Sequence, residues 1–308
     1  MDATGGGEFA AIERIRRLLP PAPAGETWSG DDAAVVVPPR GEQLVLTTDA
    51  VVAGVHADLD LVGVDDLGWK AVAAAVSDVA AMGGTARWLV AAVCGPPSTD
   101  LDRLADGMAR SAAFHGCPLV GGDLSGADEL MVVVTVIGTV EAGAAVVRSG
   151  ARVGDAVLVT GPLGASAAGL RLLRAGGRGA SGPCVDAHRR PRARLAEGRT
   201  ARLAGSTAMV DVSDGLAADL GHLAAASGVG LRLDTVPVAD GATLEEALGG
   251  GEDYELALTT PDPAGMTASF TAAGLRPPVL LGRCTADPAE RTLGGRPLPA
   301  GGWEHAWR

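Results

Sequence analysis

The feature that most constrains the fold is a repeated pairing of short apolar strands with oxygen-bearing side chains. Residues 44–46 are Leu-Val-Leu, and Thr47, Thr48 and Asp49 follow directly. Groups of the same kind occur at four further places, Asp31-Asp32, Ser77-Asp78, Gly121-Gly122-Asp123 and Asp211-Val212-Ser213-Asp214-Gly215. Such a group taken alone is also ordinary chemistry for a strand end or an Asx turn. Five groups of one type, spread over the chain, indicate a shared role.

Apolar spacing predicts strands alternating with helices along the chain. We expect helices at 8–19, 65–83, 100–115, 165–176, 189–204 and 214–227. We expect strands or apolar stretches at 30–39, 43–49, 87–95, 117–123, 130–140, 156–161, 208–212, 230–234 and 253–260. The Gly-rich residues 176–183 are predicted to form a mobile loop. Because the pattern breaks near 145–150 and then restarts, 308 residues fit two α/β units better than one core.

Composition excludes several classes of protein. The net charge of −12 disfavours non-specific binding to nucleic acid or to an anionic membrane. No apolar run approaches the ~20 residues that span a bilayer, and charges occupy the place of a signal peptide's apolar stretch, so we expect a cytoplasmic protein. Lys70 is the only lysine, and its surroundings do not form a Walker-type phosphate loop.

Asp78 stands apart from the other acids because it lies within the predicted helix 65–83, among alanines and valines. An aspartate there is either exposed on a polar face or buried against another element. The small residues around it favour close packing. A buried, unpaired carboxylate costs several kcal/mol or becomes protonated, and a bound cation removes that cost.

Carboxylates and hydroxyls are hard oxygen ligands suited to Mg²⁺, which often shares its remaining positions with phosphate. The acids therefore point to a nucleotide-phosphate site built without a P-loop. Glycines beside Asp123 and Asp214 would let backbone N–H groups approach phosphate, as would the start of the helix after Asp214. Asp214 is equally suited to be a plain helix N-cap.

Motifs along almost the whole chain resemble those of thiamine-monophosphate kinases, within the superfamily of aminoimidazole ribonucleotide synthetase. In order, they are GEFAAI (7–12), GDDAAV, TTDAVVAGVH, KAVAAAVSDVAAMGG, GGD, RSGARVGD, DVSDGLAADLGHL, GGGEDYEL and the closing GGWEHAW. GEDYEL and the Gly-x-His element are the most discriminating within the superfamily.

The resemblance implies an α/β chain of the α+β type with the two-domain aminoimidazole ribonucleotide synthetase-like fold. Domain 1–147 would bind ATP and Mg²⁺ and dimerise through a sheet that forms a barrel with its copy, and domain 148–308 would complete the active site. The implied Mg²⁺ ligands are Asp32, Thr47, Thr48, Asp49, Asp78, Asp123, Asp211 and Asp214. The implied ATP contacts are Gly122, Asp123, Arg148 and Ser213, and the implied thiamine phosphate contacts are His56, Glu252 and Trp303. The implied catalytic residues are Asp49, Asp78, Asp123, Asp214 and Arg148.

Two positions depart from the family pattern. Ala57 replaces an aromatic that often follows the histidine, and Leu124 replaces a usual threonine, in a loop that also lacks a basic residue. Taken without the resemblance, His56 is an ordinary hydrogen-bonding histidine, and Trp303 is either a tail anchor or a stacking lid.

The implied reaction is ATP-dependent phosphorylation of thiamine monophosphate to thiamine diphosphate by direct in-line transfer, in a homodimer holding several Mg²⁺ ions. Two alternatives are another ATP-using enzyme of the superfamily with a different acceptor and a non-catalytic metal- and nucleotide-binding regulator. Selenide chemistry would call for a reactive cysteine near the N-terminus, and residues 1–30 contain none.

Overall fold

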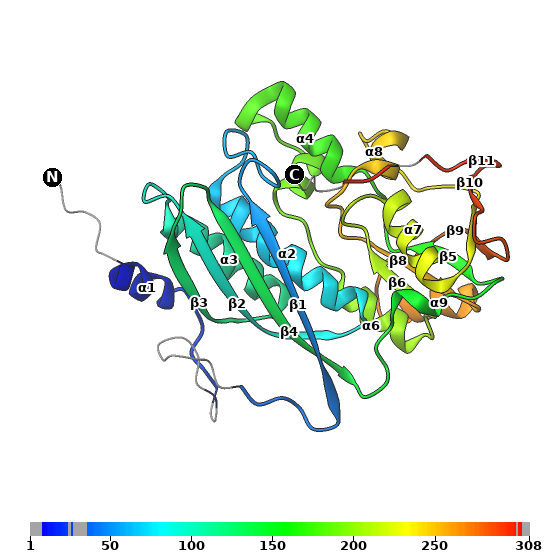
Figure 1. The fold of residues 1–308 in the computed structure, drawn as a ribbon, viewed down its shortest axis with the longest axis horizontal. Helices are drawn as coiled ribbons and strands as arrows, with labels where there is room; N and C mark the ends of the chain where they lie inside the picture. The colour runs from blue at the N-terminus through cyan, green and yellow to red at the C-terminus, as the bar shows by residue number, and fades with distance from the viewer. Residues whose placement is uncertain (1–7, 24–25, 27–35, 300, 304–308) are drawn as a thin grey trace.

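The computed structural model describes residues 8–23, 26, 36–299 and 301–303. Within these residues the chain forms a four-stranded sheet and a seven-stranded sheet, with helices packed on both (Figure 1). Asp32 and residues 30–35 of the predicted strand 30–39 lie outside the described residues, and residues 36–39 are not in a strand. Among the helices described, none has the length and apolar character needed to cross a bilayer.

The four-stranded sheet is built from the first half of the chain. Its strands are β1 (Glu42–Val52), β2 (Thr85–Gly95), β3 (Leu119–Gly126) and β4 (Met131–Glu141). The spatial order is β1-β4-β2-β3, with β2 and β3 parallel and the other pairs antiparallel. As far as the described residues go, this sheet is open, and β1 and β3 are its two edges. Leu44 and Leu46 of β1 are 53% and 66% exposed.

Helices α2 (Val64–Ala81) and α3 (Leu101–His115) cover one face of this sheet (Figure 1). Small residues allow the two helices to approach closely. A Cβ added to Gly68 would lie 2.4 Å from the Leu104 carbonyl oxygen, and one added to Gly107 would lie 2.0 Å from that of Asp65. The close packing expected for the small-residue helix is therefore confirmed.

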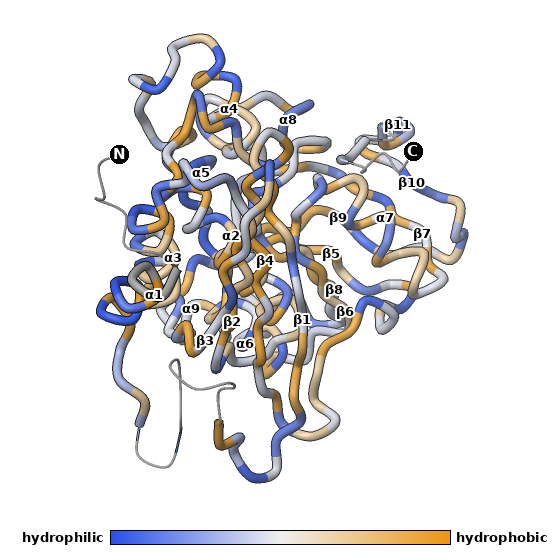
Figure 2. Tube along the Cα trace, turned by 60° about the vertical axis from the view of Figure 1, so that its left-hand side comes forward, coloured by the Kyte–Doolittle hydropathy of each residue, from blue (hydrophilic) through white to orange (hydrophobic). Residues whose placement is uncertain are grey.

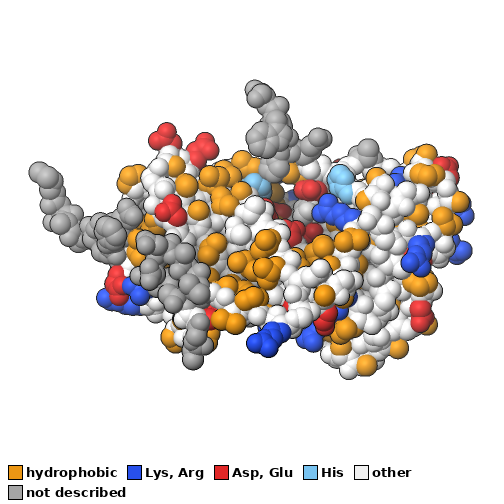
Figure 3. Space-filling view, turned by 60° about the horizontal axis from the view of Figure 1, so that its bottom comes forward, with side chains coloured by type: hydrophobic (Ala, Val, Ile, Leu, Met, Phe, Trp, Pro, Cys, Tyr) orange, Lys and Arg blue, Asp and Glu red, His pale blue; other side chains and the backbone are white. Residues whose placement is uncertain are grey.

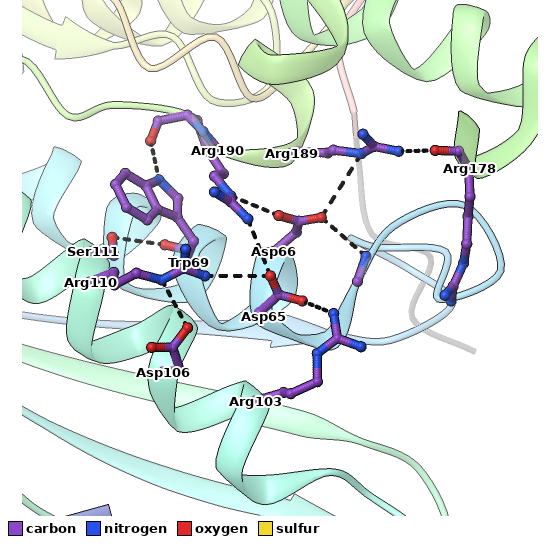
Figure 4. A network of polar contacts seen from close by, with 12 residues as sticks. Asp65, Asp66, Trp69, Arg103, Asp106, Arg110, Ser111, Arg178, Arg189 and Arg190 are labelled. Carbon is purple, nitrogen blue, oxygen red and sulfur yellow. Dashed lines mark hydrogen bonds and ion pairs between the residues drawn. The ribbon is translucent and has the colours of Figure 1, made fainter. Parts of the chain in front are cut away.

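A network of ion pairs fixes the start of α2 (Figure 4). Arg190 donates from Nε to Asp66 Oδ1 at 2.8 Å and from an Nη to Asp65 Oδ2 at 3.2 Å. Arg103 of α3 also donates to Asp65. The Trp69 indole N–H donates to the Pro191 carbonyl oxygen at 2.7 Å. These contacts connect the first turns of α2 to α3 and to a segment more than a hundred residues further along the chain.

The seven-stranded sheet is built from the second half of the chain. Its strands are β5 (Ala156–Val159), β6 (Ala208–Asp211), β7 (Gly230–Leu233), β8 (Leu256–Thr260), β9 (Val279–Thr285), β10 (Arg291–Leu293) and β11 (Arg296–Pro297). The order is β11-β10-β7-β9-β5-β8-β6, mostly antiparallel. The remaining helices are α1 (Glu8–Arg16), α4 (Ala165–Gly176), α5 (Pro183–Arg189), α6 (Leu195–Leu203), α7 (Leu216–Ser227), α8 (Leu244–Gly249) and α9 (Pro263–Ala272). Figure 2 shows that strands such as β4 and β5 are hydrophobic, whereas α1 carries both hydrophobic and hydrophilic residues.

Several sequence predictions need correction. The predicted helix 189–204 begins too early: only Arg189, the last residue of α5, and Leu195–Leu203, which form α6, are helical, and Pro191 lies in the non-helical segment between them. The predicted loop 176–183 holds a short 3₁₀ helix (Gly177–Gly179) and the start of α5, and Arg178 donates to the carbonyl oxygens of Leu59 and Asp60. The sequence prediction missed α8, α9, β9, β10, β11 and all but the last residue of α5.

Candidate active site

Two neighbouring residues of α2 contact strands of different sheets. Ser77 Oγ donates to Asp211 Oδ2 at the end of β6, over 2.7 Å. Thr47 Oγ1 on β1 donates to Asp78 Oδ2. Asp78 is half-buried, so it is not the exposed aspartate that the sequence left possible. The helix therefore connects the end of β6 with the middle of β1, at the contact between the two halves of the chain.

Four aspartates come together here, and we refer to Asp49, Asp78, Asp211 and Asp214 as the carboxylate cluster. Burial, followed by the charge of Asp78, raises the pKa of Asp211 to about 7. Burial and Asp78 likewise raise the pKa of Asp49 to about 6, with smaller contributions from Asp214 and Glu252. Burial also raises the pKa of Asp78, although Thr47 and Arg148 oppose the shift. The carboxylates thus carry more negative charge than their surroundings balance.

The donor set of the carboxylate cluster fits Mg²⁺. Aspartate and threonine oxygens are hard ligands, and a divalent cation would stabilise the ionised carboxylates that burial disfavours. Within the described part of the chain, no three His, Cys, Asp or Glu side chains are placed to hold one ion together.

Strand alternation divides the three oxygen-bearing residues of β1. Thr47 and Asp49 point toward α2, as the Thr47–Asp78 contact and the influence of Asp78 on Asp49 show. Thr48 points to the opposite face, where its Oγ1 lies 3.1 Å from Thr135 Oγ1 of β4. The side chain of Thr48 therefore does not join those of Thr47 and Asp49 within one chain.

Gly122 and Asp123 lie on β3, the opposite edge of the sheet from β1. In the ladders, Asp123 is level with Ala92 of β2, then with Val133 of β4, then with Ala50 of β1. Three strand spacings separate them, roughly 14 Å. Asp123 is exposed, and its Oδ2 accepts a hydrogen bond from Ser125 Oγ at 3.1 Å. A single chain therefore does not bring Asp123 to the carboxylate cluster.

Close packing of two strands explains why the second residue of the Gly-Gly-Asp motif is glycine. A Cβ on Gly122 would lie 2.1 Å from the carbonyl oxygen of Ala91, the residue paired with it on β2. Only glycine fits such a close approach of two backbones. Strand pairing therefore accounts for Gly122 whether or not its N–H also approaches phosphate.

The turn after β6 is held by a residue that sequence reasoning missed. Asp219 Oδ2 accepts from the backbone N–H groups of Ser213, Asp214 and Gly215, each at 3.1 Å. Burial raises the pKa of Asp219 to about 7, with a further contribution from Asp211. The N-cap of α7 is Gly215, so Asp214 is not the helix cap. These three N–H groups, expected to face phosphate, already have an acceptor.

Arg148 lies beside the carboxylate cluster on the 3₁₀ helix Arg148–Gly150. Its side chain is exposed. Its positive charge partly opposes the rise in the pKa of Asp78 and of Asp211. Its backbone is held in place, because the Arg148 carbonyl oxygen accepts from Ser227 Oγ at 2.7 Å. In Figure 3 acidic side chains gather in a hollow of the surface with Lys or Arg and His side chains next to them. An arginine at such a position suits binding of a phosphate group.

The Glu-Asp-Tyr-Glu segment forms a connection between α8 and β8. Glu252 and Tyr254 have positive φ angles of 66° and 51°, which are uncommon for residues other than glycine. Asp253 accepts from the backbone N–H groups of Gly164 and Ser166, at 2.5 Å and 3.0 Å, at the start of α4. Asp253 therefore has a structural role that the motif alone did not reveal.

The last residue of the segment, Glu255, is also structural. It is buried and accepts from Arg194 at 2.6 Å and from Thr160 at 2.5 Å. The other two residues of the motif lie near the carboxylate cluster. Glu252 contributes to the raised pKa of Asp49. Tyr254 is buried, and its pKa is raised by burial and then by the charges of Glu252, Asp49, Asp211 and Asp78.

His56 lies in the turn after β1, and Trp303 lies in the C-terminal tail. The backbone N–H of Val52 donates to His56 Nδ1 at 3.0 Å, so neutral His56 carries its proton on Nε2. Trp303 is 55% exposed, and its backbone N–H donates to the carbonyl oxygen of Asp214 at 3.0 Å. The tail is thus attached at the carboxylate cluster while the indole remains largely open to solvent.

Lys70 is a second residue that the sequence argument did not assign to the site. It is buried, and its Nζ donates to the His56 carbonyl oxygen at 3.0 Å and to Glu252 Oε2 at 2.7 Å. The available signal was a lone lysine within a helix of alanines and valines.

Comparison with known proteins agrees with this architecture. Residues 30–140 match the model for the N-terminal domain of AIR synthase related proteins, and residues 152–293 match that for their C-terminal domain. The thiamine-monophosphate kinase of Salmonella typhimurium is 38% identical over 275 residues, covering 83% of each chain. The chain belongs to the thiamine-monophosphate kinase family. That of Mycobacterium tuberculosis is 38% identical over 277 residues, covering 84% of this chain and 83% of its own.

Solved structures of family members share the fold. Thiamine-monophosphate kinase from Stenotrophomonas maltophilia superposes with a TM-score of 0.83 at 34% identity, covering 94% of this chain and 97% of that one. AaThiL complexed with AMPPCP and TMP gives a TM-score of 0.77 at 31% identity, covering 99% of both chains. HypE from E. coli, at 20% identity and a TM-score of 0.76, shares the fold alone.

Proposed function

We propose that this protein is a kinase that transfers the γ-phosphoryl group of ATP to thiamine phosphate, yielding ADP and thiamine diphosphate. The observation that carries the proposal is the carboxylate cluster with its raised pKa values, located between the two halves of the chain and next to Glu252. AaThiL, which covers 99% of this chain, has been solved with an ATP analogue and TMP together.

The chemistry of the acceptor explains the residues that are present. A phosphate monoester has a second pKa of about 6, so its attacking oxygen is already largely ionised at neutral pH. A strong general base is therefore unnecessary, and the main obstacle is repulsion between two anions. Mg²⁺ held by the carboxylate cluster would neutralise charge on the phosphoryl groups. Arg148 contributes a fixed positive charge beside the same groups.

The N-terminal sheet supports a homodimer. Exposed Leu44 and Leu46, the open edge strands β1 and β3, and the β-branched strand β4 suit pairing with a second copy to close a barrel. Closure would place an edge strand of the second copy beside β1. If that strand is β3, the partner supplies an Asp123 close to Thr48 and Asp49, which the chain's own Asp123 does not reach.

The test is an acceptor panel. The protein is incubated with ATP, Mg²⁺ and one acceptor at a time, including thiamine, thiamine phosphate and other phosphate monoesters, and ADP and new diphosphates are measured. Thiamine diphosphate formed only from thiamine phosphate supports the proposal. Turnover of a different acceptor would favour another superfamily activity, and ATP binding without turnover would favour a regulator. The cytoplasmic location expected from the sequence stays a prediction.

A further inference from the structure

Lys70 occupies a position that costs free energy unless its charge is balanced. It is 2% exposed, and a buried ammonium group requires both an anionic partner and hydrogen-bond acceptors. The structure provides both, through the carboxylate of Glu252 at 2.7 Å and the backbone carbonyl of His56 at 3.0 Å. These partners are 182 and 14 residues away in the sequence. Lys70 therefore joins the loop after β1 to the segment before β8.

The helix that carries Lys70 is fixed immediately before it. Asp65 and Asp66 in the first turn of α2 bind Arg190, and Trp69 donates to Pro191 (Figure 4). Lys70 follows Trp69 directly, so its Cα has little freedom to move relative to the second half of the chain. The Lys70 ammonium group therefore has a fixed position, and it can orient a side chain that binds to it.

Glu252 is the side chain that Lys70 orients. Its backbone is in the left-handed region, held there by its own N–H donating to the Ser213 carbonyl oxygen at 2.7 Å. Its carboxylate is 22% exposed, and Lys70 engages Oε2. Within the described residues, no hydrogen bond or ion pair joins Oε1 to a protein group, so this oxygen remains available to a donor on a ligand.

The neighbouring histidine does not replace Lys70 as a cation. His188 Nδ1 lies 3.7 Å from Glu252 Oε2, but it also lies 3.1 Å from Ser166 Oγ. Burial and then the charge of Lys70 lower the pKa of His188 to about 3, so it is neutral at physiological pH. Of the described residues, Lys70 supplies the positive charge in contact with the Glu252 carboxylate.

We propose that Lys70 is a positioning residue for the acceptor: it fixes one oxygen of Glu252, so that the other accepts a hydrogen bond from the thiamine moiety, and it holds the His56 loop at a set distance. The inference rests on the proposed function, because it assigns Lys70 to the acceptor half of the site. Its charge is used to orient a binding group and does not contact the transferred phosphoryl group.

The test compares Lys70→Met with a matched variant, Arg194→Met. Arg194 also forms an ion pair with a buried carboxylate, that of Glu255 at 2.6 Å, while its own side chain is 30% exposed. We expect Lys70→Met to raise KM for thiamine phosphate about tenfold or more, or ~1.4 kcal/mol, while KM for ATP changes less than about twofold. Arg194→Met is expected to lower the melting temperature without this selective change in KM.

A double-mutant cycle shows whether Lys70 acts through Glu252. In the Glu252→Gln background, Lys70→Met should change KM for thiamine phosphate by less than about threefold, because the oriented group is already lost. The double variant also avoids a lone buried charge, so it serves if Lys70→Met alone does not fold. A full additional increase in this background would overturn the proposal, as would equal increases in both KM values.

The design separates this proposal from the proposed function. The wild-type acceptor panel is run first. If the wild type phosphorylates an acceptor other than thiamine phosphate, the proposed function fails. The same Lys70→Met comparison is then made with that acceptor, and an unchanged KM would reject the positioning role.

Discussion

Two regions of this molecule look alike in sequence and differ in the folded chain. Asp78 and Asp211 lie where α2 meets both sheets, and burial raises the pKa of each. Gly122 and Asp123 lie on an edge strand, exposed and about three strand spacings from β1. In the first region one chain brings several acids together at a cost in stability, whereas in the second the chain leaves Asp123 apart from them. The difference teaches that a shared local motif does not determine which acids a chain brings together.

Removing a carboxylate from the first region should have the largest effect. We expect Asp49→Asn to lower kcat by a factor of about a hundred or more, because one lost ligand forfeits several kcal/mol of charge stabilisation. Omission of Mg²⁺ should abolish turnover of the wild type. Steady-state kinetics with a melting curve provide the check.

Asp106→Asn is the matched control for this variant, since Asp106 is an exposed acid on α3 that pairs with Arg110 at 2.9 Å. It should keep wild-type turnover. Near-normal turnover of folded Asp49→Asn would reject Asp49 as a Mg²⁺ ligand. The first region would then no longer differ from the second as a metal site.

Mixing two inactive variants tests whether the second region serves a partner. If each site takes Asp49 from one chain and Asp123 from the other, random mixing of Asp49→Asn with Asp123→Asn restores about one quarter of the sites. We expect activity to rise toward that fraction after the subunits are exchanged. Activity that stays at the level of the separate variants, in dimers shown to have exchanged, would mean that each chain uses its own Asp123.

Trp303 tests whether a solvent-exposed residue can still belong to the substrate-binding site. It is as open to solvent as an edge residue, yet its backbone is bonded to Asp214. If its indole stacks on thiamine, Trp303→Ala forfeits about 1–3 kcal/mol, which raises KM for thiamine phosphate about five- to a hundredfold. KM for ATP should barely change, and Trp303→Phe should recover most of the loss.

The competing role for Trp303 is that of a tail anchor. A lower melting temperature with both KM values unchanged would establish that role, and the stacking lid would then be wrong. Kinetics with each substrate varied in turn separate the two outcomes.

The sequence revealed the first region better than the second because the relevant physics is local. The small residues around Asp78 favoured close packing over exposure, and its partial burial and its contact with Thr47 agree with that. The separation of Thr48 from Thr47 follows from the period of two in a strand. The position of Asp123 depends on the strand order β1-β4-β2-β3, which no local pattern encodes.

Long-range partners explain the other misses in the site. Lys70 depends on Glu252, which is 182 residues away. In the sequence Asp219 is an ordinary residue of a predicted helix. Its role comes from the three backbone N–H groups that donate to it in the folded chain. The interruption at Pro191 was readable from the sequence and was overlooked. The strand β9 lies between β5 and β7 in the sheet, and its role is set by pairing with segments far away in the chain.

The smallest expected effect concerns stability in the absence of metal. It distinguishes the two regions because a stability gain is expected in the first region only. The pKa of Asp211 is about 7 in the folded chain against an ordinary 3.8. Between these pH values the folded state binds more protons than the unfolded state, so the free energy of unfolding falls as pH rises. In EDTA at pH 8, Asp211→Asn should therefore melt about 2–4 °C above wild type, since it keeps an oxygen for Ser77 and loses the charge. At pH 5 the gain should be less than half as large, because folded Asp211 is then protonated, and it should vanish only below the ordinary pKa of 3.8. Asp123→Asn, in an exposed place, should show no such pH-dependent gain. Thermal unfolding at both pH values is the measurement, and a gain for Asp211→Asn that is equal at pH 5 and pH 8 would show that buried charge is not what destabilises the first region.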